Sequence, residues 1–205
     1  MTIYALSSDS GITRVDATNK KNKIDLKPIF IVGVPRCGST VVERIIGSGK
    51  KLIPIGEETG VIRKYIQQKI LKKKSFNLGT TKEIVNELYN IYKEKGLVSE
   101  KYNYIFTDKS LDNFFYIELL KEIYPNSKII NCKRNVLSSI MSIFQNNLTL
   151  LAWTHDLNNI FKYFDNYFKI IENYKKANPK LFYELKFEEL INNPEEESKK
   201  LMEYC

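Results

Sequence analysis

The chain has 205 residues, an apolar content of 43% and a formal net charge of +8. This length fits one domain with an adequate core, and no run of about 18 or more uncharged apolar residues predicts a membrane-spanning helix. Three cysteines without metal-ligand spacing and one histidine, His155, argue against a zinc site and a disulfide framework. The net charge indicates an anionic partner. Because lysines and arginines are scattered, a highly charged small ligand explains it as well as nucleic acid or a membrane surface.

Residues 1–27 are polar and weakly patterned, and we expect them to form an arm or a peripheral strand followed by a linker. They lack the apolar centre of a signal peptide, which favours a cytoplasmic protein. The domain itself is expected over residues 28–205. Its first element is a buried strand over Ile29–Val32, a short β-branched and aromatic run that Gly33 closes.

A loop that contains Arg36 connects this strand to a helix. Gly38 precedes the helix, in which apolar residues recur at helical spacing and Glu43 lies on the opposite, polar side. Free N–H groups and the positive end of the helix dipole predict an anion-binding loop. The pattern nearly matches the nucleotide-binding P-loop, G-x-x-x-x-G-K-[ST], but Ser39 stands at the lysine position, which weakens a kinase or NTPase interpretation. An ordinary βα turn is the alternative.

The remaining elements alternate between helices and strands. We predict helices over residues 61–71, 81–95, 114–124, 136–144 and 155–177, a last helix after Asn193, and strands over residues 104–107, 128–132 and 181–185. This order predicts an α/β fold with a mainly parallel sheet, helices on both faces and a ligand site at the carboxyl ends of the strands.

Charged side chains follow these elements at positions suited to anion binding. Lys109 and Arg134 come directly after two of the buried strands, where ligands of α/β sheets bind. Ser142 lies eight positions after Arg134, so a phosphate beside the helix could contact both residues. An exposed structural lysine and a surface arginine are the alternatives. Glu57 and Glu58 lie on a turn-like segment, where solvated surface carboxylates are the alternative.

The segment GVPRCGSTVVERI resembles the 5′-phosphosulfate loop of sulfotransferases that use 3′-phosphoadenosine-5′-phosphosulfate (PAPS). It is most similar to tyrosylprotein sulfotransferases and their bacterial relatives, in which PRSGTT is usual. The resemblance implies a P-loop NTPase-like fold. It also implies that the 5′-phosphosulfate is bound by Arg36, Cys37, Gly38, Ser39 and Thr40.

The resemblance extends to the candidate catalytic groups. The G-E-E-T segment implies that Glu58 is the base that accepts the proton of an acceptor hydroxyl. Glu57 is the alternative, because the segment lies one residue farther from the loop arginine than in the family. The Asp-Lys pair implies that Lys109, with Arg36, stabilises the transferring sulfuryl group. Gly60 replaces the arginine that follows the base in the family, which argues against peptide-tyrosine specificity.

In the same family an arginine and a serine eight positions later hold the 3′-phosphate, and Arg134 and Ser142 keep this spacing. The implied reaction is metal-free transfer of a sulfuryl group from PAPS to a hydroxyl or amine of a small-molecule, carbohydrate or peptide acceptor. Related enzymes continue beyond the last helix, in which this sequence ends at Cys205, so we expect a C-terminally short domain. The alternatives are a non-catalytic PAPS- or PAP-binding module and, with less support, a P-loop kinase or NTPase. We expect neither a nucleic-acid partner nor a membrane partner. The sequence does not decide whether the chain forms a homo-oligomer.

Overall fold

The computed structural model describes residues 25–50, 52–73, 79–146, 148 and 151–205. Most of the predicted N-terminal arm therefore lies outside the described residues, although Lys27 already belongs to the first strand. Within the described residues, four parallel strands form one sheet in the order β2-β1-β3-β4. They are β1 (Lys27–Gly33), β2 (Ile105–Asp108), β3 (Lys128–Lys133) and β4 (Tyr183–Lys186).

Strand β1 lies between β2 and β3, where both of its faces are covered. Every residue from Pro28 to Gly33 is buried, as expected for a continuous apolar run in a parallel sheet. Because the strands are parallel, their carboxyl ends point to one edge of the sheet, where Gly33 is level with Cys132 and Asp108 is level with Phe30.

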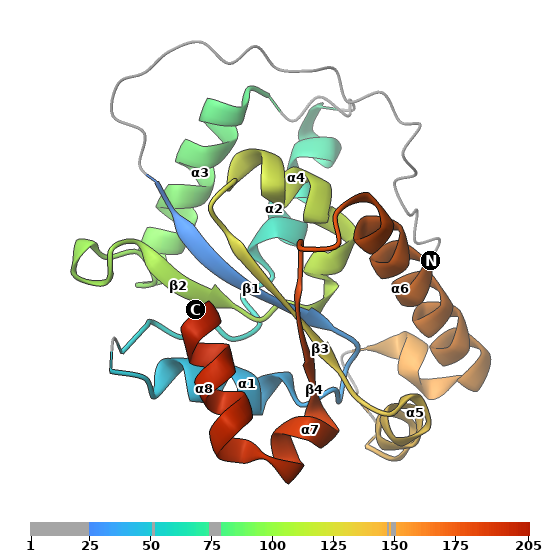
Figure 1. The fold of residues 1–205 in the computed structure, drawn as a ribbon. Coiled ribbons are helices and arrows are strands. Elements are labelled where there is room, and N and C mark those ends of the chain that lie inside the picture. The colour runs from blue at the N-terminus through green and yellow to red at the C-terminus, as the bar shows by residue number, and fades with distance from the viewer. Residues whose placement is uncertain (1–24, 51, 74–78, 147, 149–150) are drawn as a thin grey trace.

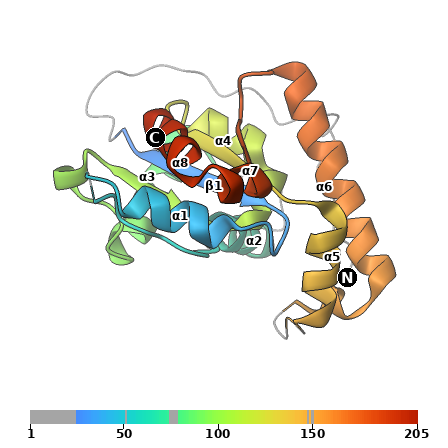
Figure 2. The same cartoon turned by 60° about the horizontal axis from the view of Figure 1, so that its bottom comes forward.

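The helices cover both faces of this sheet (Figure 1). Helix α1 lies against α8 on one face, while α2, α3 and α4 gather on the other and share a core with Phe30 and Phe106. Figure 2 shows α5 beside the long helix α6. The helices are α1 (Ser39–Gly47), α2 (Val61–Lys73), α3 (Thr81–Glu94), α4 (Ile117–Ile123), α5 (Val136–Gln145), α6 (Leu157–Ala177), α7 (Phe187–Asn192) and α8 (Pro194–Tyr204). The predicted α/β architecture is confirmed.

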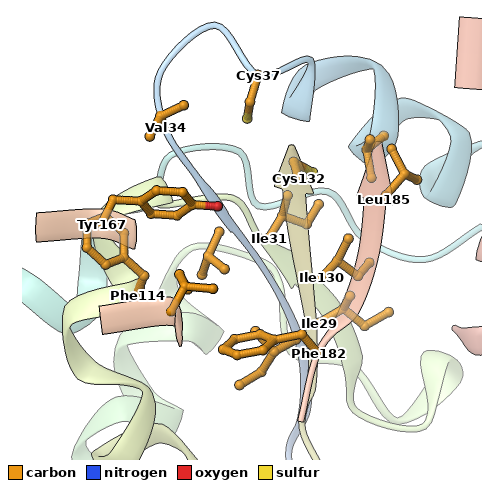
Figure 3. Close-up of a cluster of buried hydrophobic side chains, with 14 of the residues drawn as sticks. Ile29, Ile31, Val34, Cys37, Phe114, Ile130, Cys132, Tyr167, Phe182 and Leu185 are labelled. Atoms are coloured by element: carbon orange, nitrogen blue, oxygen red, sulfur yellow. The ribbon is translucent and has the colours of Figure 1, made fainter. Parts of the chain in front are cut away.

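The larger core cluster joins β1 and β3 to helices α1, α6 and α8. Figure 3 shows part of this cluster around β1 and β3. The ring of Phe114 meets that of Tyr167 edge-on, with centroids 5.2 Å apart. The Tyr167 hydroxyl donates to Asn131 Oδ1 at 2.6 Å, which ties α6 to the face of β3 opposite α1. Among the described residues, no helix combines the length and the apolar character that crossing a bilayer requires.

Local signals set several element ends, and two predicted helices differ from the structure. Thr80 caps α3 in a capping box with Glu83, as the hydroxyl residue before the helix predicts. The predicted helix over residues 114–124 is instead a 3-10 segment (Leu111–Tyr116) followed by α4. The predicted helix over residues 155–177 begins after Asp156, whose carboxylate accepts from the Asn159 N–H at 2.8 Å.

Candidate functional site

The loop after β1 requires an unusual backbone. Gly38, the N-cap of α1, has φ of 91°, in the left-handed region that favours glycine. A Cβ atom at this position would overlap the ring of Phe187 from α7. Arg36 also has a positive φ, 70°, which is uncommon for a residue with a side chain. This conformation leaves the Arg36 side chain exposed at the carboxyl end of β1.

Helix α1 presents its N-terminus in this loop. The N–H groups of Val41 and Val42 both donate to the Gly38 carbonyl. Gly38, the N-cap residue, has no side chain that could accept from the other N–H groups of the first turn. The first N–H groups of a helix have no intrahelical acceptor and carry the positive end of the dipole. Thr40 is exposed beside them, while the Ser39 side chain is buried. The geometry therefore suits an anion, as the sequence predicts.

Two arginines and a serine from distant segments meet at this loop. Arg36 Nε donates to Ser142 Oγ at 3.0 Å, although the two residues are 106 positions apart. Arg134 Nη1 donates to the Arg36 carbonyl at 3.1 Å. The Arg134 guanidinium also lies over the Phe187 ring, 5.2 Å from its centroid, which orients it by a cation–π contact. The structure thus brings Arg36, Arg134 and Ser142 together.

The side chain of Cys37 points away from this group. It is buried, and Figure 3 shows it turned from the loop toward Cys132 at the end of β3. A hydrogen bond from the Cys132 thiol lowers the pKa of Cys37, and the same contact together with burial raises the pKa of Cys132. The Cys37 N–H donates to the Val34 carbonyl at 3.3 Å. Cys37 therefore shapes the loop from inside, and its thiol is not brought to the exposed arginines.

The segment with the two candidate acids runs along β2. The Thr107 N–H donates to the Pro54 carbonyl at 3.0 Å, and the Lys109 N–H donates to the Glu57 carbonyl at 2.8 Å. Between them the Gly56 N–H donates to Thr107 Oγ1 at 3.0 Å. A Cβ atom on Gly56 would overlap the Thr107 carbonyl, so glycine is needed for this close approach. These contacts hold residues 54–57 against the strand.

Glu58 and Lys109 form an ion pair at the end of β2. Lys109 Nζ lies 3.2 Å from Glu58 Oε1. The lysine side chain is only 6% exposed and the glutamate side chain is 71% exposed, so the ammonium is held beneath a carboxylate that is open to solvent. The lysine is therefore buried, whereas the structural alternative expected an exposed side chain. Glu57 takes part through its backbone, and its side chain is exposed.

A buried carboxyl group on α1 was missed from the sequence. Glu43, expected on a polar face, is 2% exposed, whereas apolar Val41 is 44% exposed. Glu43 Oε1 accepts from Thr107 Oγ1 at 2.6 Å and from the Glu57 N–H at 3.0 Å. Burial raises the pKa of Glu43, and the hydrogen bond from Thr107 and the Lys109 charge offset part of this rise. The helical stripe formed by residues 39, 42, 43 and 46 could have indicated its burial.

A second buried carboxylate, Asp108, anchors the segment from the other face of the sheet. It is 0% exposed, and Oδ2 accepts from the hydroxyls of Thr59 and Tyr92, each at 2.7 Å. Oδ1 accepts from the Ser110 N–H at 3.0 Å, and Ser110 Oγ accepts from the Gly60 N–H at 2.8 Å. These bonds fix the backbone directly after Glu58.

A sequence model of the sulfotransferase family matches residues 28–205. The chain belongs to the sulfotransferase family. It is 29% identical over 192 residues to an uncharacterised protein of Aquifex aeolicus (strain VF5). The aligned region covers 87% of this chain and 25% of that relative, so the chain spans about a quarter of the relative's length.

Two solved sulfotransferases share the fold. For sulfotransferase STF9 from Mycobacterium avium the TM-score is 0.53 at 12% identity, over 88% of this chain and 64% of that one. For sulfotransferase STF1 from Mycobacterium tuberculosis it is 0.55 at 13% identity, over 87% of this chain and 67% of that one. At such identities the likeness concerns the fold, and the predicted P-loop NTPase-like arrangement is confirmed.

Proposed function

We propose that the protein is a sulfotransferase that binds PAPS at the loop after β1 and transfers its sulfuryl group to a hydroxyl or amine acceptor. The observation that carries this proposal is the convergence of Arg36, Arg134 and Ser142 beside the N-terminus of α1. The Glu58–Lys109 pair at the end of the neighbouring strand β2 supports it.

The residues present fit the two charged ends of PAPS. The 5′-phosphosulfate would be held by the first N–H groups of α1, the Thr40 hydroxyl and Arg36. The 3′-phosphate would be held by Arg134, whose guanidinium can donate in a bidentate manner, and by Ser142. In this arrangement the hydrogen bond between Arg36 and Ser142 connects the proposed 5′-phosphosulfate site to the proposed 3′-phosphate site.

When bound, PAPS would supply the sulfuryl group and leave as PAP. The exposed Glu58 carboxylate is open to an acceptor and would take the proton from its hydroxyl or amine as the acceptor atom bonds to sulfur. The Lys109 ammonium, buried beneath Glu58, would stabilise the negative charge that develops on the departing oxygen. Arg36 would stabilise the same charge from the loop.

Calorimetric titration with PAP, with ATP–Mg²⁺ as the comparison, tests the binding site. We expect PAP to bind and ATP–Mg²⁺ to give no response. Arg36→Ala and Arg134→Ala should each weaken PAP binding by roughly 1.5–3 kcal/mol, because each removes a charge-assisted contact. Arg44→Ala is the matched control, since Arg44 is an exposed arginine of α1 away from the loop. Unchanged affinity in both loop variants would refute the site.

Transfer is tested with radiolabelled PAPS and a panel of phenols, aliphatic alcohols and amines. Glu58→Gln should keep PAP affinity and abolish transfer, because the amide cannot accept the proton. Retained turnover would assign the base elsewhere, with Glu57→Gln as the next variant. PAP binding without transfer to any acceptor would favour the non-catalytic binding module.

A further inference from the structure

A carboxyl group lies buried between the anion-binding loop and the candidate catalytic pair. Glu43 is in the second turn of α1, which begins in that loop, and its side chain is 2% exposed. Burying a carboxyl group is costly unless donors satisfy it.

The donors that satisfy Glu43 come from the two segments that carry Glu58 and Lys109. Thr107 Oγ1, two residues before Lys109, donates to Glu43 Oε1 at 2.6 Å. The Glu57 N–H, in the residue before Glu58, donates to the same oxygen at 3.0 Å. One carboxylate oxygen on α1 therefore joins the end of β2 to the acid-bearing loop.

Glu57, whose N–H binds Glu43, directly precedes Glu58 of the ion pair. Glu57 has φ of 53°, so its backbone is in the left-handed region, which is uncommon for a residue with a side chain. Its N–H is held by Glu43, and its carbonyl accepts from the Lys109 N–H at 2.8 Å. The residue that presents Glu58 is thus fixed on both sides.

Charges around Glu43 also connect it to this pair. The Lys109 ammonium favours the ionised form of Glu43, whereas the Glu57 carboxylate opposes it. Lys109 therefore lies within electrostatic reach of two carboxylates, the buried one of Glu43 and the exposed one of Glu58.

We propose that Glu43 is a positioning residue that couples the anion-binding helix to the catalytic pair by holding the Glu57 amide and the Thr107 hydroxyl. Through these two bonds it sets where Glu58 and Lys109 lie relative to the bound anion. The functional consequence rests on the proposed sulfotransferase activity, whereas the structural coupling does not.

Amide hydrogen exchange of the full chain tests the coupling without any activity. Glu43→Ala should raise exchange of the Glu57 amide by about tenfold or more, the equivalent of one lost hydrogen bond. Glu43→Gln keeps an acceptor oxygen and should stay close to the wild type. Arg44→Ala, the exposed neighbour, is the matched control. Equal exchange in Glu43→Ala and Arg44→Ala would overturn the proposal.

Kinetics then separate positioning from a general loss of structure. In Glu43→Ala we expect kcat to fall by about tenfold or more while PAP affinity stays within about threefold, because the arginines are untouched. Glu43→Gln should recover most of kcat. Raised exchange with unchanged kcat, or a Glu43→Gln variant as slow as Glu43→Ala, would overturn the positioning role.

Two further measurements keep the outcomes distinguishable. If Glu43→Ala fails to fold, Thr107→Val removes only the hydroxyl that bridges Glu43 and Gly56 and should raise exchange over residues 54–58. Unaltered exchange in this variant would overturn the coupling. A wild-type protein that binds no PAP and transfers nothing would refute the proposed function alone, since the exchange result is read independently.

Discussion

Replacing Asp108 by asparagine should destabilise the fold strongly, although the shapes of the two side chains are nearly the same. The native carboxylate accepts bonds from the Thr59 and Tyr92 hydroxyls on Oδ2 and from the Ser110 N–H on Oδ1. An amide has one oxygen, so its NH₂ group must face either the Ser110 N–H or the two hydroxyls. At least one native hydrogen bond to a buried charge is lost in either orientation.

The size of this loss follows from the contacts. A hydrogen bond to a charged group contributes about 1.5–3 kcal/mol, and a buried donor left unpaired adds a desolvation cost, so Asp108→Asn should lower the free energy of unfolding by roughly 2–4 kcal/mol. For a domain of this size, 1 kcal/mol corresponds to about 2–4 °C in Tm. Tyr92→Phe removes one of the three bonds and should cost about 1.5–3 kcal/mol. Burial raises the pKa of Tyr92, which keeps its hydroxyl protonated as a donor.

Urea unfolding followed by circular dichroism measures these values, and the double variant completes a cycle. The two substitutions share a bond, so their costs should add to more than the cost of the double variant, by about 1 kcal/mol. Asp165→Asn on the exposed face of α6 is the matched control and should change stability by less than about 0.5 kcal/mol. An Asp108→Asn protein as stable as this control, with an unchanged m value, would refute the reasoning.

Two other predictions concern α1. Gly38→Ala should destabilise the protein by about 2–3 kcal/mol in urea unfolding, because φ of 91° disfavours a side chain and the new Cβ overlaps Phe187. The same variant should weaken PAP binding in calorimetry. A stability equal to that of the wild type would contradict this prediction. Burial raises the pKa of Glu43 above its ordinary value of 4.5, so the native state holds the proton more tightly than the unfolded state. The stability of the wild type relative to Glu43→Gln should therefore fall as the pH rises above the ordinary value of 4.5 in urea unfolding, and a constant difference would contradict the assignment.

Local signals and the rules of parallel sheets account for the strand-end residues and the loop of the candidate site. The apolar run before Gly33 and the glycine before α1 predict the anion-binding loop. Lys109 and Arg134 were predicted from their positions directly after buried strands, because parallel strands end at the same edge. Ser142 was expected at the same site through its spacing from Arg134, and the structure places it against Arg36.

The sequence by itself determined the order of elements, the α/β class and the residues at the strand ends, since these depend on periodicity and local conformation. Only the tertiary structure decided that Cys37 turns inward and that Glu43 and Asp108 are buried. The donors that make these burials favourable lie far along the chain: Thr107 is 64 positions from Glu43, and Thr59 is 49 positions from Asp108. A charged side chain is predicted to be exposed when only the neighbouring sequence is considered. The partners that compensate its desolvation come into contact with it only when the strands and helices pack.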